Sequence, residues 1–96
     1  MKHALVVEDD PQVRTLTQWI LESEGFHVEL AENGKVALDI LLDQPPPDII
    51  LLDINMPVMD GSEFLEKISK EDKIKKIPLV LVSADVERQS FFFSEV

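Results

Sequence analysis

The sequence predicts an α/β domain built on a parallel β-sheet. Short apolar runs rich in Val, Ile and Leu alternate along the chain with stretches whose apolar residues recur every three or four positions. The first pattern is typical of strands buried on both faces, and the second of amphipathic helices. Strands that alternate with helices favour a parallel sheet with right-handed crossovers and helices on both faces. The chain has 96 residues, which suffices for one small domain.

The first strand–helix unit lies at the N-terminus. Residues 4–7 form an apolar run that predicts a buried strand, and Pro11 suits the first turn of a helix running to about Glu24. Asp10, directly before this proline, is a good N-cap, and Gly25 is expected to end the helix. Four apolar residues are expected to form its core-facing stripe: Val13, Leu16, Ile20 and Leu21.

Three further units follow. Residues 26–31 alternate apolar and polar side chains, as in a strand near a sheet edge, and a second helix is expected from Asn33–Gly34 to the prolines at 45–47. A third strand ends at Asp53, and residues 77–82 predict a fourth strand. Between them a third helix is expected after Gly61, with three residues inward: Phe64, Leu65 and Ile68.

The composition excludes several classes of function. There are 19 acidic and 9 basic residues, a net charge of −10, which argues against unaided binding to nucleic acid or to an anionic membrane. The chain has no cysteine, so disulfides and thiolate chemistry are excluded. No apolar run approaches the roughly 20 residues of a membrane span, and no signal peptide is recognisable. We therefore expect a cytoplasmic protein.

Oxygen-bearing side chains follow three of the predicted strands. Asp9 and Asp10 follow the first strand, Asp53 ends the third and Ser83 follows the fourth. All these strand ends lie on one side of a parallel sheet, where open α/β folds bind ligands. If the first and third strands are neighbours, the carboxylates converge, and hard oxygen ligands in a small pocket suit Mg²⁺. A carboxylate beside the ion could then attack phosphorus and form an acyl phosphate.

Simpler interpretations of these residues remain open. Asp10 could serve only as a helix N-cap, Asp53 could be a solvated residue at a strand end, and Ser83 could be an ordinary turn residue. The argument for a site is that all of them fall at one end of a sheet inferred independently from the apolar pattern.

Three motifs carry a family resemblance over residues 1–84. They are Ala-Leu-Val-Val-Glu-Asp-Asp, Leu-Leu-Asp-Ile-Asn-Met-Pro-Val-Met-Asp-Gly and Leu-Val-Leu-Val-Ser-Ala. In the second motif, Pro57 follows Asp53 by four residues and Gly61 follows it by eight, and Ser83 lies thirty residues after Asp53. The chain thus resembles the receiver domain of two-component response regulators, which implies a flavodoxin-like fold with strand order 2-1-3-4.

The resemblance implies a role for each candidate residue. Asp53 would accept a phosphoryl group from a histidine kinase or phosphotransfer protein. Asp10 and Asp53 would bind Mg²⁺ directly with the backbone carbonyl of Asn55, and Asp9 would act through metal-bound water. Ser83 would be the switch hydroxyl. The domain would be a signalling module and not an enzyme.

The C-terminal part departs from the family pattern. Receivers carry a lysine roughly twenty residues beyond the switch hydroxyl, at the tip of a fifth strand, and this chain has no counterpart. Only residues 84–90 precede the three phenylalanines at 91–93, too few for a parallel crossover. We therefore expect a receiver core over 1–84, an impaired switch, and a tail over 85–96 that is helical or disordered.

Loss of the fifth strand would leave the fourth strand as an apolar edge. An open edge is a template for pairing, so a homo-oligomer through the fourth strand is expected. Two other functions remain open: an interaction or oligomerisation module with a vestigial acidic site, and an aspartate-nucleophile phosphohydrolase. Position 55 is Asn, where such hydrolases usually place a second aspartate. His3 and His27 are too far apart in the sequence to suggest a metal pair, and are interpreted as ordinary strand or surface residues.

Overall fold

The fold is a five-stranded sheet with two described helices. The computed structural model describes residues 2–53, 66–67, 70–71, 74, 76–85 and 90–95, the backbone alone for 81–85 and 90–95. The elements in chain order are β1 (Lys2–Val7), α1 (Pro11–Ser23), β2 (Phe26–Ala31), α2 (Gly34–Asp43), β3 (Ile49–Asp53), β4 (Leu79–Asp85) and β5 (Ser90–Glu95).

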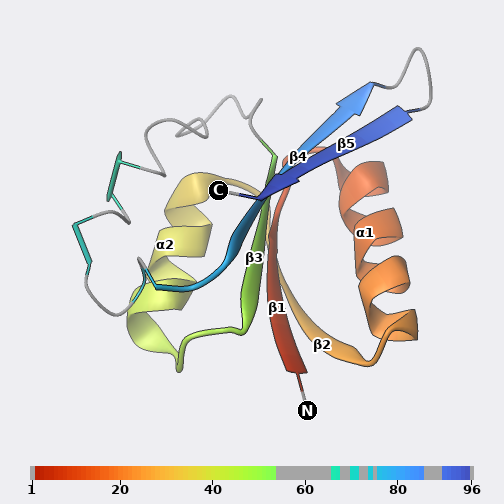
Figure 1. The fold of residues 1–96 in the computed structure, drawn as a ribbon. Coiled ribbons are helices and arrows are strands. Elements are labelled where there is room, and N and C mark those ends of the chain that lie inside the picture. The colour runs from red at the N-terminus through yellow and green to blue at the C-terminus, as the bar shows by residue number, and fades with distance from the viewer. Residues whose placement is uncertain are drawn as a thin grey trace.

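The first four strands form the parallel sheet that the sequence predicts. Their order is β2-β1-β3-β4, and β1, paired with β2 and β3, lies inside the sheet. The helices α1 and α2 lie on opposite faces of this sheet (Figure 1). The expected flavodoxin-like architecture is confirmed, and it brings the C-terminal ends of β1 and β3 side by side.

The fifth strand differs from the expectation. Ser90–Glu95 pairs antiparallel with β4, so a helical or disordered tail is wrong for these residues. A parallel neighbour would need a crossover of a dozen residues or more, whereas an antiparallel one needs only a short connection, here residues 86–89. Because β5 covers β4 from Val80 to Asp85, the open β4 edge expected for an oligomer is also absent.

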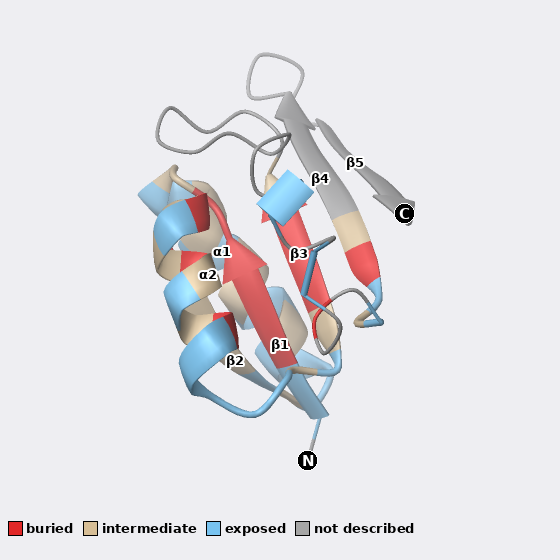
Figure 2. Cartoon of the chain, turned by 90° about the vertical axis from the view of Figure 1, so that its left-hand side faces the viewer, coloured by how far each residue is buried: buried red, intermediate tan, exposed pale blue. Residues whose placement is uncertain are grey.

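The core lies mainly between the sheet and α2. Residues 4–7 of β1 are all buried, as are residues 50–52 of β3, which explains why both strands are continuous apolar runs (Figure 2). The side chains that form the main cluster come from the sheet, α2 and the segment before β4: Leu5, Val7, Ala31, Ala37, Leu41, Ile50, Leu52, Ile74 and Leu79. Burial of each large aliphatic side chain contributes about 1.5–3 kcal/mol.

Helix α1 begins as expected but presents a different face to the sheet. Asp10 is its N-cap and Pro11 its first residue, and Gly25, with φ of +91°, follows its C-terminal end. None of its residues is fully buried, and Leu16 and Ile20 are 41% and 55% exposed. The expected core stripe is therefore wrong for these two, because the helix is rotated so that its more buried positions are Val13, Arg14, Thr17, Gln18 and Leu21.

Helix α2 follows the prediction closely. The side chain of Asn33 accepts a hydrogen bond from the backbone N–H of Val36, and Ala37 and Leu41 are buried. The predicted third helix, with Phe64, Leu65 and Ile68, lies outside the described residues except for 66–67, which are helical. Within the described part of the chain, neither helix has the length and apolar character needed to cross a membrane.

Candidate functional site: an acidic cluster at the strand tips

Three carboxyl groups meet at the C-terminal edge of the sheet. Glu8 and Asp9 directly follow β1, and Asp53 is the last residue of β3. The parallel register pairs Val7 with Leu52. The next residues along the two strands are Glu8 and Asp53, so their carboxyl groups lie side by side at the edge of the sheet. We call Glu8, Asp9 and Asp53 the acidic cluster.

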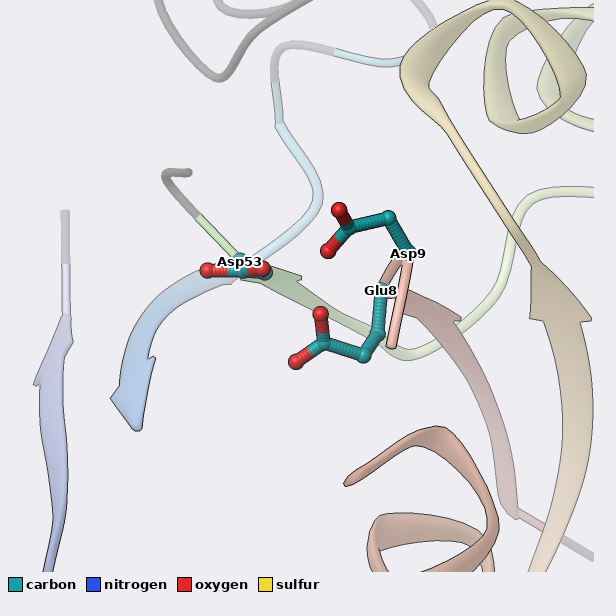
Figure 3. A group of neighbouring side chains, drawn as sticks. All are labelled: Glu8, Asp9 and Asp53. Carbon is teal, nitrogen blue, oxygen red and sulfur yellow. The ribbon is translucent and has the colours of Figure 1, made fainter. Parts of the chain in front are cut away.

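The cluster is compact. One carboxylate oxygen from each residue lies within 4.8 Å of those from the other two. Figure 3 shows the carboxyl groups of Glu8 and Asp9 extending toward Asp53. Glu8 is only 4% exposed, whereas Asp9 and Asp53 are partly exposed. The cluster is thus open to solvent on one side and backed by the core on the other.

Glu8 has the most perturbed environment among the described residues. Its pKa is raised from 4.5 to about 9, first because burial disfavours the charged form. Hydrogen bonds with the Asp53 and Asp9 side chains and the charge of Asp53 raise this pKa further, while the backbone N–H of Asp10 lowers it by donating to Oε2 at 3.3 Å. At neutral pH without a cation, Glu8 is therefore a neutral acid beside Asp53.

The β1–α1 connection is held in place by hydrogen bonds. The backbone N–H of Glu8 donates to the carbonyl of Ala31 at 3.0 Å. The Arg14 guanidinium donates to the carbonyl of Glu8 at 2.9 Å and to that of Asp9 at 3.5 Å. Arg14 thus fastens the start of α1 to the residues that carry two of the three carboxyl groups.

Oxygen atoms at this spacing suit a hard divalent cation. Three carboxylates this close repel one another, and burial beside Asp53 raises the pKa of Glu8, which favours its protonated form in the absence of a cation. Mg²⁺ prefers oxygen ligands and binds through a few carboxylates while keeping several waters. The residues present therefore fit Mg²⁺.

Asp10 is adjacent to the acidic cluster, but its carboxyl group is not one of the three that meet there. Its Oδ1 accepts hydrogen bonds from the backbone N–H groups of Gln12 at 2.8 Å and Val13 at 3.2 Å. Asp10 therefore caps α1, the interpretation that the sequence had left open beside metal binding.

Glu8 takes the place in the cluster that the sequence analysis gave to Asp10. A signal for it was present in the sequence: once Asp10 is assigned to capping before Pro11, Glu8 and Asp9 are the acids left at the strand tip.

Of the other expected site residues, the structure describes the backbone of Ser83 but not Asn55. The backbone of β4 pairs Val82 with Asp53, so Ser83 lies one residue beyond the register partner of Asp53. Ser83 is also paired with Phe92 of β5. Asn55, Pro57 and Gly61 lie outside the described residues.

Comparison with known sequences agrees with the resemblance to response regulator receiver domains. The sequence pattern of the response regulator receiver domain matches residues 4–92. The chain is 39% identical over 83 residues to the two-component response regulator ORR11 of Oryza sativa subsp. indica, covering 86% of this chain and 56% of that protein. It is 34% identical over 88 residues to the phosphate regulon transcriptional regulatory protein PhoB of Escherichia coli, covering 92% of this chain and 38% of PhoB. The chain thus spans well under two thirds of these relatives.

Solved structures agree with the sequence comparison. The N-terminal domain of a response regulator receiver protein from Methanoculleus marisnigri superposes with a TM-score of 0.81 at 35% identity, covering 88% of this chain and 68% of that one. The response regulator TrrA from Thermotoga maritima, solved in complex with Mg²⁺-BeF, gives 0.80 at 35% identity, with 93% and 75% covered.

Proposed function

Because this chain belongs to the response regulator receiver domain family, a regulatory family of two-component signalling, we propose that Asp53 is its phospho-acceptor. The observation that carries the proposal is the acidic cluster, in which the carboxyl groups of Glu8 and Asp9 lie beside Asp53. The complex of the related TrrA with Mg²⁺-BeF supports a magnesium-dependent reaction here as well.

In this proposal the cluster residues hold the ion. Glu8, Asp9 and Asp53 supply carboxylate oxygens, and the backbone carbonyl of Asn55 is an additional ligand. When bound, Mg²⁺ neutralises charge on the phosphoryl oxygens and positions them in line with the acceptor. Asp10 remains the N-cap of α1, at the edge of the cluster.

The proposed reaction transfers a phosphoryl group from a histidine of one partner protein to Asp53. An Asp53 carboxylate oxygen attacks phosphorus as the bond from phosphorus to the donor's imidazole nitrogen breaks, which leaves an acyl phosphate on Asp53 and a neutral histidine on the donor after protonation. The donor is a histidine kinase or a phosphotransfer protein. Glu8 must lose its proton as the ion binds, because a ligating carboxylate is deprotonated.

Ser83 is proposed as the switch hydroxyl. Its backbone position, one residue beyond the partner of Asp53 across the β3–β4 pairing, supports a hydrogen bond to the new phosphoryl group.

The direct test is intact-mass spectrometry of the chain after treatment with acetyl phosphate and Mg²⁺. We expect addition of one phosphoryl group, sensitive to hydroxylamine as an acyl phosphate is. The addition should be lost with EDTA and in Asp53→Asn, and kept in the matched variant Asp39→Asn on α2. A phosphoryl group that persists in Asp53→Asn, or no addition to the unaltered chain, would refute Asp53 as the acceptor.

A further inference from the structure

A histidine pair lies at the opposite end of the sheet from the acidic cluster. The parallel register of β1 and β2 places His3 directly opposite His27. Their rings lie 5.2 Å apart between centroids, edge to face at 68°. The sequence analysis had dismissed this pair because the two residues are far apart along the chain, and strand pairing overturns that argument.

Glu29 adds a carboxylate to the pair. It lies two residues after His27 on β2, and side chains at this spacing point to the same face of a sheet. The His27 Nε2 and Glu29 Oε1 atoms are 3.7 Å apart. Two ligands on one tetrahedral Zn²⁺ ion, bonded at 2.0–2.1 Å, are separated by about 3.3 Å. The distance between His27 Nε2 and Glu29 Oε1 is therefore close to that between two ligand atoms on one Zn²⁺ ion.

These three side chains line one cavity beside the C-terminal end of α2. Its volume is about 210 Å³, and its lining also includes Gln44, the C-cap of α2, and Pro45–Pro47. The C-terminal end of a helix carries partial negative charge and favours cations. The last turn of α2 has no basic residue, and none of the described residues that line the cavity is a lysine or arginine.

The backbone that carries His3 is fixed. Its N–H donates to Asp48 Oδ2 at 2.7 Å, and its carbonyl accepts from the Asp48 N–H at 2.8 Å. The His27 and Glu29 side chains are 53% and 46% exposed, so solvent reaches the space between them.

We propose that His3, His27 and Glu29 form a second metal site, selective for a borderline-soft divalent ion such as Zn²⁺. Two imidazole nitrogens and one carboxylate oxygen are a ligand set that Zn²⁺ takes and Mg²⁺ does not favour, and water completes the tetrahedron. The proposal requires that the exposed His3 ring turn from its edge-to-face position, so that one of its nitrogens is directed toward His27 and Glu29. The site is independent of phosphorylation at Asp53, which lies at the other end of the sheet.

The test is a calorimetric titration of the chain with Zn²⁺ in the presence of saturating Mg²⁺, which occupies the acidic cluster. We expect one site and a shift of both histidine imidazole resonances in the NMR spectrum on binding. His3→Gln and His27→Gln should each weaken Zn²⁺ binding by roughly tenfold or more, and Glu29→Gln should weaken it too, because each removes one ligand. Circular dichroism checks that these surface variants remain folded.

Two control variants separate this site from other carboxylates. Asp53→Asn reports on the acidic cluster, and Glu22→Gln is a charge-matched change on α1. Both should leave Zn²⁺ binding unchanged within about twofold. The proposal is overturned if the chain does not bind Zn²⁺. It is also overturned if His27→Gln leaves Zn²⁺ binding unchanged, which would mean that His27 is not a ligand, or if Asp53→Asn abolishes Zn²⁺ binding.

Discussion

At the scale of single residues, Glu8 is the group whose chemistry depends most on the fold. It is 4% exposed, and its pKa of about 9 keeps it protonated at neutral pH without metal. As a neutral acid it can donate a hydrogen bond to Asp53; as a carboxylate it can bind a cation. In the proposed magnesium site, the protonation of this one side chain is therefore coupled to metal binding.

This coupling predicts a pH dependence of stability. The folded-state pKa of Glu8 lies above its ordinary value of 4.5, so its favourable contribution is complete below about pH 4.5 and is lost as the pH rises through about 9. In EDTA, the free energy of unfolding from urea titrations should therefore include a contribution from Glu8 that decreases as the pH rises from about 4.5 to about 9. Glu8→Gln, which cannot ionise, should lack this component and be the more stable protein at pH 8.

Magnesium supplies the control for that experiment. Saturating Mg²⁺ should stabilise the unaltered chain most at high pH, because it binds the deprotonated acid. It should stabilise Glu8→Gln much less. Equal pH profiles for the two proteins in EDTA would contradict the raised pKa.

At the scale of elements, the adjacent residues Asp9 and Asp10 in the β1–α1 connection make different interactions. Asp9 faces Asp53, whereas Asp10 accepts the N–H groups of Gln12 and Val13. The division follows from geometry, since the N-cap residue directs its side chain back over the first turn. Two neighbouring aspartates should therefore respond differently to the same substitution.

The matched pair Asp9→Asn and Asp10→Asn tests this division. Asparagine caps a helix as well as aspartate does, so Asp10→Asn should change both stability and Mg²⁺ affinity little, whereas Asp9→Asn should weaken Mg²⁺ binding roughly tenfold or more. Asp10→Ala should cost about 1 kcal/mol of stability. Calorimetric Mg²⁺ titration and urea unfolding measure the two effects. A larger loss of Mg²⁺ affinity in Asp10→Asn than in Asp9→Asn would show that Asp10 is the ligand after all.

Gly25 ends the α1 element for a backbone reason. Its φ of +91° is rarely adopted by residues with a side chain, yet a Cβ built there would meet nothing within 4 Å. Gly25→Ala should therefore cost about 1–2 kcal/mol through backbone strain alone, and Gly25→Asn less, because asparagine tolerates positive φ. Urea unfolding of the two variants gives the comparison; equal stability of Gly25→Ala and the unaltered chain would contradict it.

At the scale of the whole molecule, β1 connects the two candidate sites. The histidine pair lies at its start, the acidic cluster follows its end, and the residues between, 4–7, are buried under both helices (Figure 1). Because these buried residues hold β1 between β2 and β3, they set the spacing of the side chains in both candidate sites.

The core should therefore govern stability far more than the exposed face of α1. Leu5 is 1% exposed and Trp19 is 64% exposed. Leu5→Ala should cost about 2–5 kcal/mol through lost burial and a cavity, a large share of the stability of a small domain. Trp19→Gln should change the free energy of unfolding by less than about 1 kcal/mol. Urea titrations followed by far-ultraviolet circular dichroism compare them, and similar costs for the two would contradict this packing.

Much of the fold could be predicted because its signals are local. The apolar runs at 4–7 and 49–52, the Asp10–Pro11 and Asn33–Gly34 helix starts and the Gly25 stop each depend on residues close together in the chain. The inward face of α1 was predicted only in part. Val13 and Leu21 are partly buried as expected, whereas Leu16 and Ile20 are exposed, because all four fit a helical stripe and only packing on the sheet selects among them.

By itself, then, the sequence determined the parallel sheet, its strand tips and the aspartate at the end of β3, since short apolar strands and their flanking turns specify themselves locally. Only the tertiary structure decided which acids join Asp53, that Ser90–Glu95 pairs antiparallel with β4, and that His3 meets His27. Each of these depends on the register between segments distant in the chain, and register is set by the packing of the whole sheet.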